Sequence, residues 1–308
     1  MRFFHKFCSM NYIFFGLADG IMLSVKRKTK YNRAIEYLDK YSYALDDMKI
    51  LPISDKYSNK IWQCWFQGKE NMPPIVKKCT ETVNKFHSDR VIFLDNNNIF
   101  DYVEFPDYVI DKYRKGIISH ANFSDMLRLA LIAQYGGTWV DSTIYLTDKI
   151  PDDILNAELF MFKPMKSFVL KYCDSLEDFK MYSNDLDSDI TTMSSFFVGA
   201  KAGNPVINGV LNLFFEYWKH ENSTIDYLMV DRLFTLTFLH DKSLMQKYMD
   251  IPMHEVENLY LLQDALFERY DENLFNKIKT KSAIHKLTHK NLHRNHFEDS
   301  FLNIILKK

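Results

Sequence analysis

Residues 120–146, HANFSDMLRLALIAQYGGTWVDSTIYL, contain the clearest structural pattern in the chain. Apolar side chains recur at helical spacing over residues 122–135, which predicts a helix. Gly136 and Gly137 follow directly, and glycine readily adopts the positive φ that the end of a helix often needs. Residues 138–140 (TWV) are then β-branched and aromatic, which predicts a strand that leads into an aspartate.

Two further strand patterns lie upstream. Residues 60–66 (KIWQCWF) are apolar and aromatic, and residues 90–94 (RVIFL) form a short continuous apolar run, as buried strands do. Between them, Pro74 can open a helix over residues 75–86. Strand, helix and strand in this order predict a βαβ unit, that is, a parallel sheet covered by helices. Ligands of such sheets bind beyond the carboxyl ends of the strands, which directs attention to the residues that follow each strand.

The composition is that of a globular protein, with 47% hydrophobic and 26% charged residues. Lys and Arg number 39 and Asp and Glu number 40, so the net charge of -1 lacks the basic excess typical of nucleic-acid-binding proteins. The four cysteines are scattered without a CxxC pair. This excludes the common cysteine zinc motifs and a disulfide framework, and it favours a reducing cytoplasm.

Residues 1–50 predict a helical N-terminal extension. Its apolar run from residue 12 to residue 25 is shorter than the roughly 20 residues that span a bilayer. A basic cluster follows at residues 26–33, and apolar aromatics beside such a cluster suit contact with anionic lipid. A helix packed on the main domain, with its lysines in water, is the alternative. Residues 31–48 predict an amphipathic helix whose apolar face comprises Ala34, Leu38, Tyr41 and Leu45.

Charged residues gather around the predicted helix and the strand that follows it. Asp125 and Arg128 are three residues apart, so they lie on one helix face and can reach the same ligand. Asp141 ends the strand, and Thr143 points to the same side if the strand continues. An acidic residue at a strand end can hold a divalent cation, while a carboxylate and an arginine suit sugar hydroxyls and phosphate oxygens. These residues therefore indicate a nucleotide-diphosphate ligand, although a surface ion pair and a solvated aspartate fit the same spacing.

With these motifs, residues 120–146 resemble the signature of the capsular polysaccharide synthesis family of glycosyltransferases. That family is related to the DXD sugar-binding transferases, which include yeast mannosyltransferases and the glucosylating clostridial toxins. The shared pattern is Ser-Asp, two residues, Arg, a Gly-Gly turn, three residues and an acidic motif. The resemblance is strong over residues 60–151, where IWQCWFQGKENMPPIVKKC and VIFLDNNNI resemble the first two strands of these families. It is patchy to residue 289, within SAIHKLTHK, which resembles a late histidine segment.

The resemblance implies an α/β protein with a GT-A fold, in which a Rossmann-like nucleotide-binding sheet is flanked by helices and the C-terminal half is rich in helices. It implies that Trp65 stacks on the nucleobase of the donor and that Gln63 lines the same pocket. Asp125 would bind ribose or sugar hydroxyls, and Arg128 would bind the sugar or the phosphate. Asp141 would be the first acidic residue of the DXD motif and, with Arg128, would serve catalysis.

The second acidic position of that motif holds Thr143, whose neutral hydroxyl is a weaker ligand for Mg²⁺ or Mn²⁺ than a carboxylate. We still expect a divalent cation, held by Asp141, Thr143 and His285. The alternatives are that the metal arrives with the nucleotide, or that positive side chains take over part of its role.

Three histidines near the C-terminus, His285, His289 and His293, are spaced four residues apart and can share a helix face. One interpretation is a zinc site. A second is that His285, alone or together with Lys286, contacts the donor diphosphate, and a third is a solvent-exposed basic helix. Asp95 follows a predicted strand and is a further candidate for donor contact, although such Asp-Asn runs often form only turns.

On the acceptor side, Asp226 and Asp231 lie in an apolar helical stretch, DYLMVDRLF. A buried acid there is costly unless it is paired, so either is expected to face the acceptor cleft. An exposed ion pair between Asp231 and Arg232 is the alternative.

The sequence therefore predicts an extension over residues 1–50 and a GT-A domain over residues 51–308, with the donor site mainly in 60–151 and the acceptor side mainly in 190–290. The expected enzyme transfers a sugar from a nucleotide-diphosphate donor, foremost a UDP-sugar, to a lipid-linked or growing surface polysaccharide, with retention of configuration. We expect it in the cytoplasm, peripherally at the inner face of the cell membrane, with no nucleic-acid partner. A toxin-like protein glycosyltransferase and a non-catalytic nucleotide-sugar-binding or assembly protein are the alternatives.

Overall fold

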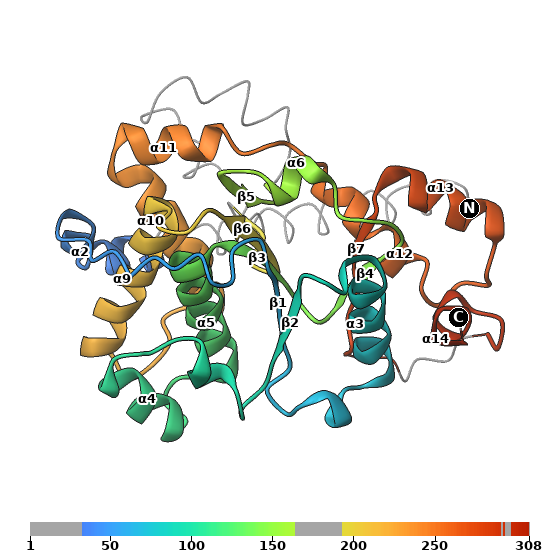
Figure 1. The fold of residues 1–308 in the computed structure, drawn as a ribbon, viewed down its shortest axis with the longest axis horizontal. Helices are drawn as coiled ribbons and strands as arrows, with labels where there is room; N and C mark the ends of the chain where they lie inside the picture. Colours follow the sequence, from blue (N-terminus) through green and yellow to red (C-terminus); the bar gives the residue numbers. More distant parts are fainter. Residues whose placement is uncertain (1–32, 164–192, 291, 293–296, 308) are drawn as a thin grey trace, which may run out of the picture.

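The computed structural model describes residues 33–163, 193–290, 292 and 297–307. Within these residues a five-stranded sheet forms the centre (Figure 1), with strands β1 (Ile61–Cys64), β2 (Val91–Leu94), β3 (Gly137–Val140), β5 (Leu159–Met161) and β6 (Phe197–Ala200). Their order is β2-β1-β3-β6-β5. Strand β1 pairs in parallel with β2 and β3, whereas β6 pairs antiparallel with β3 and β5. The predicted α/β class with a parallel unit is therefore confirmed.

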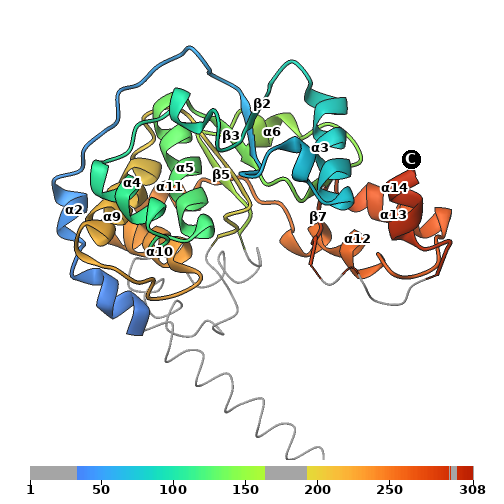
Figure 2. The same cartoon turned by 90° about the horizontal axis from the view of Figure 1, so that it is seen from below.

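Helices lie on both sides of this sheet (Figures 1 and 2). One group surrounds α5 (His120–Tyr135) and consists of α2 (Tyr43–Asp46), α4 (Asp107–Arg114), α9 (Pro205–His220), α10 (Met229–His240) and α11 (Lys242–Met249). The other group consists of α3 (Pro74–His87), α12 (Leu261–Asp264), α13 (Glu272–Lys281) and α14 (Phe301–Lys307). The short α6 (Asp152–Leu155) precedes β5. The predicted helix-rich C-terminal half is confirmed in the described residues.

A second, two-stranded sheet joins the middle of the chain to its C-terminal part. Strand β4 (Ile144–Leu146) pairs antiparallel with β7 (Ile284–Lys286), so that Ile144 stands opposite Lys286. Strand β4 also packs against α3, whose Thr82 hydroxyl accepts a hydrogen bond from the Leu146 backbone N–H at 2.9 Å. Because β4 begins shortly after β3 ends, this pairing brings the C-terminal segment next to the end of β3.

The turn between α5 and β3 forms as the sequence predicts. Helix α5 begins at His120, two residues earlier than expected, because the Ser119 hydroxyl caps its first turn. Gly136 and Gly137 follow the helix with φ values of 70° and 86°. A Cβ atom on Gly137 would lie 2.3 Å from the Lys60 carbonyl oxygen, so only glycine fits where β3 starts alongside β1.

Replacing Gly137 with alanine is expected to lower the free energy of unfolding by about 3 kcal/mol or more, because the substitution adds a backbone clash to an unfavourable positive φ. Gly116→Ala is the matched control, since Gly116 has a φ of 71° but a Cβ there meets nothing within 4 Å. Urea unfolding of both variants separates the clash from the φ strain. Equal losses of stability would contradict the close approach of β1 and β3.

The described part of the predicted N-terminal extension packs on α9 and shares the main hydrophobic core. Residues 33–39 and α2 are helical, but residues 40–42 form a turn, so the helix predicted over residues 31–48 is interrupted. Its predicted apolar face is buried as expected, at Ala34, Leu38, Tyr41 and Leu45. The apolar run and most of the basic cluster on which the membrane-contact prediction rests lie outside the described residues.

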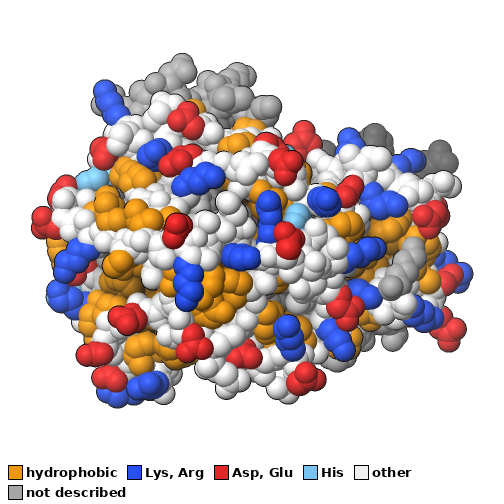
Figure 3. Space-filling model, viewed as in Figure 1, with side chains coloured by type: hydrophobic (Ala, Val, Ile, Leu, Met, Phe, Trp, Pro, Cys, Tyr) orange, Lys and Arg blue, Asp and Glu red, His pale blue; other side chains and the backbone are white. Residues whose placement is uncertain are grey.

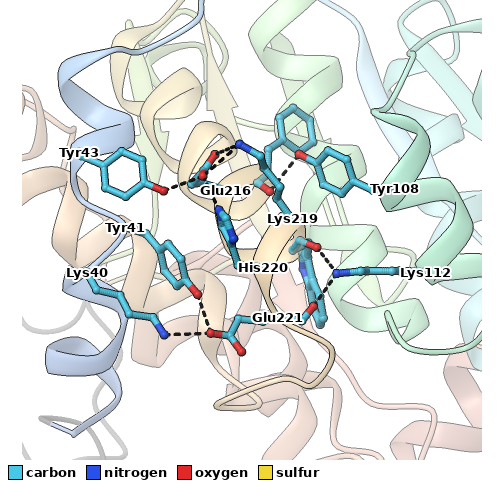
Figure 4. A network of polar contacts seen from close by, with 11 residues as sticks. Lys40, Tyr41, Tyr43, Tyr108, Lys112, Glu216, Lys219, His220 and Glu221 are labelled. Carbon is cyan, nitrogen blue, oxygen red and sulfur yellow. Dashed lines mark hydrogen bonds and ion pairs between the residues drawn. The ribbon is translucent and has the colours of Figure 1, made fainter.

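Polar contacts with Glu221, directly after α9, hold this extension in place (Figure 4). The carboxylate accepts a hydrogen bond from the Tyr41 hydroxyl at 2.5 Å and another from the Lys40 ammonium at 2.9 Å. Hydrogen bonds, first from Tyr37 and then from Tyr41 and Lys40, lower the pKa of Glu221 to about 2. The Glu221 backbone carbonyl accepts a further hydrogen bond from Lys112 of α4 at 2.8 Å. One residue therefore links the extension to two helices of the domain.

The surface carries both signs of charge. Figure 3 shows Lys and Arg side chains interspersed with Asp and Glu side chains over the face in view, with hydrophobic atoms between them. This mixture agrees with the near-zero net charge of the sequence. Of the helices that the structure describes, none combines the length and the apolar character needed to cross a membrane.

Candidate functional site

A pocket of about 700 Å³ lies beyond the carboxyl ends of β1 and β3. Residues that follow these two strands line one part of it, the first turns of α5 line another, and the segment from β7 onwards lines a third. Parallel sheets bind their ligands at this edge. The pocket brings together five of the predicted site residues, Trp65, Asp125, Arg128, Asp141 and Thr143.

Arg128 lies at the centre of the polar contacts in this pocket. Its Nη1 atom is 3.1 Å from Asp125 Oδ1, and its Nη2 atom is 3.8 Å from Asp141 Oδ1. Nη1 also donates a hydrogen bond to the Ser195 carbonyl, and the guanidinium carbon lies 5.1 Å from the Trp139 ring centre. Trp139 in turn donates from Nε1 to Asp141 Oδ1 at 2.8 Å. These contacts fix the orientation of a guanidinium and a carboxylate side by side.

Asp125 is almost fully buried beside this arginine, with 7% of its surface exposed. Burial raises the pKa of Asp125 to about 6, although Arg128 opposes the rise, and Asp141 adds to it. At neutral pH the carboxylate is therefore mostly ionised. In that state it can only accept hydrogen bonds, which suits a ligand that presents hydroxyl groups.

Lys286 adds a second cation to the pocket. Its ammonium nitrogen lies 3.3 Å from Asp141 Oδ2 and donates a hydrogen bond to the Thr143 hydroxyl. The same nitrogen lies 5.2 Å from the centre of the Phe196 ring. Lys286 thus contacts both Asp141 and Thr143, the two residues at which the resemblance predicts a divalent cation.

His285 does not reach the pocket, and the predicted histidine helix is wrong. His285 and Lys286 are neighbours on strand β7, so their side chains point to opposite faces. His285 is fully buried, and its Nε2 atom lies 3.1 Å from the Thr147 hydroxyl. Of the other two histidines, His289 lines the pocket and His293 lies outside the described residues. The predicted role of His285 as a metal and diphosphate ligand is therefore not supported by its position.

The burial of His285 makes protein stability depend on pH. Burial lowers its pKa to about 4, so the imidazole is neutral in the folded protein. In the unfolded chain it takes up a proton below about pH 6.5, so unfolding becomes more favourable as the pH falls from about 6.5 to about 4. As the pH is lowered through this window, we expect the free energy of unfolding of the wild type to fall by about 3 kcal/mol relative to that of His285→Gln. Urea titrations at both ends of the window measure the change, and a difference that stays constant would contradict a buried neutral imidazole.

Of the three site residues predicted around the first two strands, only Trp65 lines the pocket. Its ring centre lies 5.5 Å from that of His289, and the two rings are nearly perpendicular, at 88°. Gln63 is fully buried in β1, between β2 and β3, and its side-chain amide has no hydrogen-bond partner among the described residues. Asp95 accepts a hydrogen bond from the Asn97 backbone N–H at 2.8 Å and so closes the turn after β2. The structure therefore places Gln63 and Asp95 outside the pocket lining.

Asp226 and Asp231 lie outside the pocket lining as well, buried together with Arg232. Arg232 Nη1 is 2.6 Å from Asp231 Oδ2, and Arg232 Nη2 is 3.4 Å from Asp226 Oδ2. No member of this trio is more than 5% exposed, so the alternative of an exposed ion pair is wrong. Asp231 Oδ1 also accepts a hydrogen bond from the Met193 backbone N–H at 3.1 Å. The trio therefore anchors the segment that carries Ser195, the partner of Arg128.

Two tyrosines of the pocket do not emerge from the sequence reasoning. Tyr227 is 73% exposed and Tyr260 is 38% exposed, and both line the pocket. Each stands just before a helix and outside any periodic pattern, so only the packing of distant segments brings them together. The only local signal for Tyr227 is its place in the sequence, directly after Asp226, which was a candidate for the acceptor side.

An O-glycosyltransferase, braB from Annulohypoxylon truncatum, is 27% identical to the chain over 177 residues. The match covers 54% of this chain and 38% of braB, so the chain spans well under half of that protein's length. A solved structure titled PaToxG Glycosyltransferase is 14% identical, with a TM-score of 0.41 over 85% of this chain and 100% of that one.

The family described as capsular polysaccharide synthesis protein matches residues 17–305, which is nearly the whole chain and includes every residue of the pocket. This agrees with the resemblance carried by the helix, the Gly-Gly turn and the acidic motif. The chain therefore belongs to the capsular polysaccharide synthesis protein family.

Proposed function

We propose that this protein is a glycosyltransferase that binds a nucleotide-diphosphate sugar, foremost a UDP-sugar, in the pocket at the end of β1 and β3. The observation that carries the proposal is the convergence of Arg128 and Lys286 on Asp141. Two cations fixed beside a strand end suit a diphosphate, which carries several negative oxygens. The family match and the name of the relative braB support the same reaction class.

In the proposed complex each part of the donor has a partner in the pocket. Trp65 stacks on the nucleobase, because an aromatic ring offers a flat apolar face to any base. Asp125 accepts hydrogen bonds from ribose or sugar hydroxyls. Arg128 and Lys286 bind the diphosphate and stabilise the charge that develops on it as the sugar departs. No side chain in the pocket needs to become covalently bound to the sugar.

A divalent cation fits this set of residues poorly. The motif offers one carboxylate, Asp141, and the Thr143 hydroxyl, and the ammonium of Lys286 already contacts both. His285, the expected third ligand, is buried on the other face of β7. In the part of the chain that the structure describes, no group of three His, Cys, Asp or Glu side chains could hold a metal ion.

The acceptor is proposed to enter over Tyr227 and Tyr260. Exposed aromatic faces at a pocket suit sugar rings, which present apolar C–H faces. In keeping with the family description, we propose a growing surface polysaccharide or its lipid-linked precursor as the acceptor, with transfer that retains configuration. A lipid-linked acceptor would require the enzyme to work at the inner face of the cell membrane.

Thermal unfolding with a panel of nucleoside diphosphates tests the proposal, since a ligand of the folded state raises the midpoint by mass action. We expect one base, foremost uracil, to give the largest shift, and the matching nucleotide sugars to be hydrolysed slowly without acceptor. A panel without any shift, together with no hydrolysis, would overturn the proposed function.

Trp65→Ala is expected to raise the Kd of UDP by about tenfold to 100-fold, because stacking on a base contributes about 1–3 kcal/mol. Isothermal titration measures the change. Trp65→Phe keeps an aromatic face and should recover most of the affinity, whereas Tyr43→Ala, on α2 and exposed, serves as the control. An unchanged Kd in Trp65→Ala would remove the nucleobase from this part of the pocket.

A further inference from the structure

We propose that Lys286 replaces the divalent cation in this enzyme, so that donor binding and sugar transfer proceed without a metal. The inference rests on the proposed function and assigns the neutralisation of the donor diphosphate to two side chains, Lys286 and Arg128. It differs from the sequence-based expectation, in which Asp141, Thr143 and His285 hold Mn²⁺ or Mg²⁺.

The position of Lys286 is fixed by the backbone on both sides of it. Lys286 pairs with Ile144 across the β4–β7 ladder, and the next residue, Leu287, donates its backbone N–H to the Thr143 carbonyl at 3.0 Å. The side chain therefore starts from a well-defined point next to the motif. Its ammonium reaches Asp141 and the Thr143 hydroxyl together, so it occupies the position that a metal ion bound by these two residues would take.

Both oxygens of the Asp141 carboxylate already have positive or hydrogen-bonding partners. Oδ1 accepts from Trp139 Nε1 at 2.8 Å and lies 3.8 Å from Arg128 Nη2, while Oδ2 lies 3.3 Å from Lys286 Nζ. A divalent cation at this carboxylate would stand a few ångströms from two fixed positive charges. Such like charges repel strongly where water is partly excluded. The same two charges attract a diphosphate.

The substitution of one acidic motif position by Thr143 fits this arrangement. If position 143 also held a carboxylate, the motif would carry two negative charges, and Lys286 could neutralise only one of them. Each of the two acids that line the pocket is paired with a base, Asp125 with Arg128 at 3.1 Å and Asp141 with Lys286 at 3.3 Å, and Lys290 lies in the lining as a further base. A bound diphosphate then gains two cations: Arg128, which its partners hold in place, and Lys286, whose long stem can turn towards the ligand without moving the backbone.

The reaction balances without a metal. The bond between the anomeric carbon of the sugar and the diphosphate oxygen breaks, and its electron pair stays on that oxygen. The ammonium of Lys286 and the guanidinium of Arg128 stabilise this charge by hydrogen bonds. The acceptor hydroxyl oxygen forms the new bond to the anomeric carbon, and its proton passes to the departing diphosphate.

Isothermal titration of UDP into the wild-type protein, once with excess EDTA and once with MnCl₂, tests the inference directly. We expect a Kd that agrees within about threefold between the two conditions. A Kd at least about tenfold higher in EDTA would overturn the inference while leaving the proposed function intact. No binding in either condition would instead overturn the proposed function, so the two failures are distinguishable.

The affinity of the Lys286→Met variant for UDP is a second test of the inference. In EDTA it is expected to raise the Kd of UDP by about tenfold to 100-fold, the usual contribution of a charge-assisted hydrogen bond. Because the substitution frees Asp141 and Thr143, Mn²⁺ should restore part of the affinity, and Lys286→Met combined with Thr143→Asp should restore more. Lys281→Met, which neutralises an exposed lysine at the end of α13, is the matched control. A Lys286→Met protein that binds UDP as the wild type does would also overturn the inference.

Discussion

Arg128→Met lowers the turnover of a nucleotide-sugar donor by about 100-fold to 1,000-fold, if Arg128 stabilises the departing diphosphate as proposed. The expected loss is large because the guanidinium is held in place before any ligand arrives, by Asp125, Ser195 and the Trp139 ring. Such a group reorganises little during the reaction, and its removal therefore raises the barrier directly. The measurement is the initial rate of nucleotide release from the donor at saturating donor concentration.

Two further variants make the Arg128 result specific. Arg128→Lys keeps the charge but loses the planar pair of donors, so we expect it to recover only part of the activity. Arg114→Met removes an exposed arginine on α4 and should leave turnover within about twofold of the wild type, as surface substitutions usually do. Turnover by a folded Arg128→Met protein at the wild-type rate would exclude this side chain from the reaction.

Asp231→Asn is expected to lower the free energy of unfolding by about 3 kcal/mol, because it breaks the shorter of the two buried ion pairs of Arg232 and leaves the guanidinium with Asp226 at 3.4 Å. Asp231 is 1% exposed and binds both the Arg232 guanidinium and the Met193 backbone N–H. An amide in its place removes the negative charge next to Arg232. Urea unfolding of wild type and variant measures the loss.

The exposed pair between Asp299 and Arg269 provides the matched control. Their side chains are 59% and 67% exposed, at a distance of 3.4 Å, and exposed pairs contribute less than about 1 kcal/mol. Asp299→Asn should therefore change stability little. If the two substitutions cost the same, the trio around Arg232 is not a buried structural unit, and a role for Asp231 at the acceptor side would return.

The central part of the fold follows from local patterns in the sequence. Helix α5, the Gly-Gly turn and β3 are encoded by apolar spacing and by two glycines that the backbone requires, so each can be predicted without knowledge of distant residues. The βαβ order then places Trp65 and Asp141 at one edge of the sheet. Asp125 and Arg128 follow from helical spacing, and the structure brings all four into one pocket.

Local patterns offered Lys286 as a contact of the donor diphosphate only alongside His285, and they could not separate the two residues. Histidines spaced four residues apart indicate a helix, yet the segment Ile284–Lys286 is a strand because it pairs with β4 from the middle of the chain. In a strand the period of two turns His285 inwards and Lys286 towards the pocket. The misassigned period therefore placed His285 in the donor site, whereas of these two neighbours only Lys286 lines the pocket.

The acceptor side shows a second limit of sequence reasoning. An acidic residue in an apolar helix indicates either a functional cleft or a buried partner of opposite charge. The sequence shows that burying the carboxylate would cost free energy, but it does not identify the residue that pairs with it. Here Arg232 binds both Asp226 and Asp231, so ion pairs inside the core offset the free energy of burying the two carboxylates. Tyr227 lines the pocket, but it belongs to no periodic pattern, and its place directly after Asp226 is its only signal in the local sequence.

The most direct test of the donor site compares the affinity of the wild-type protein for UDP with its affinity for uridine by isothermal titration. Arg128 and Lys286 can contact the diphosphate but have no partner in the nucleoside. We therefore expect UDP to bind at least about 100-fold more tightly, and Arg128→Met to remove most of that advantage. Equal affinity for UDP and uridine, or an advantage that persists in Arg128→Met, would contradict a diphosphate site at the end of β3.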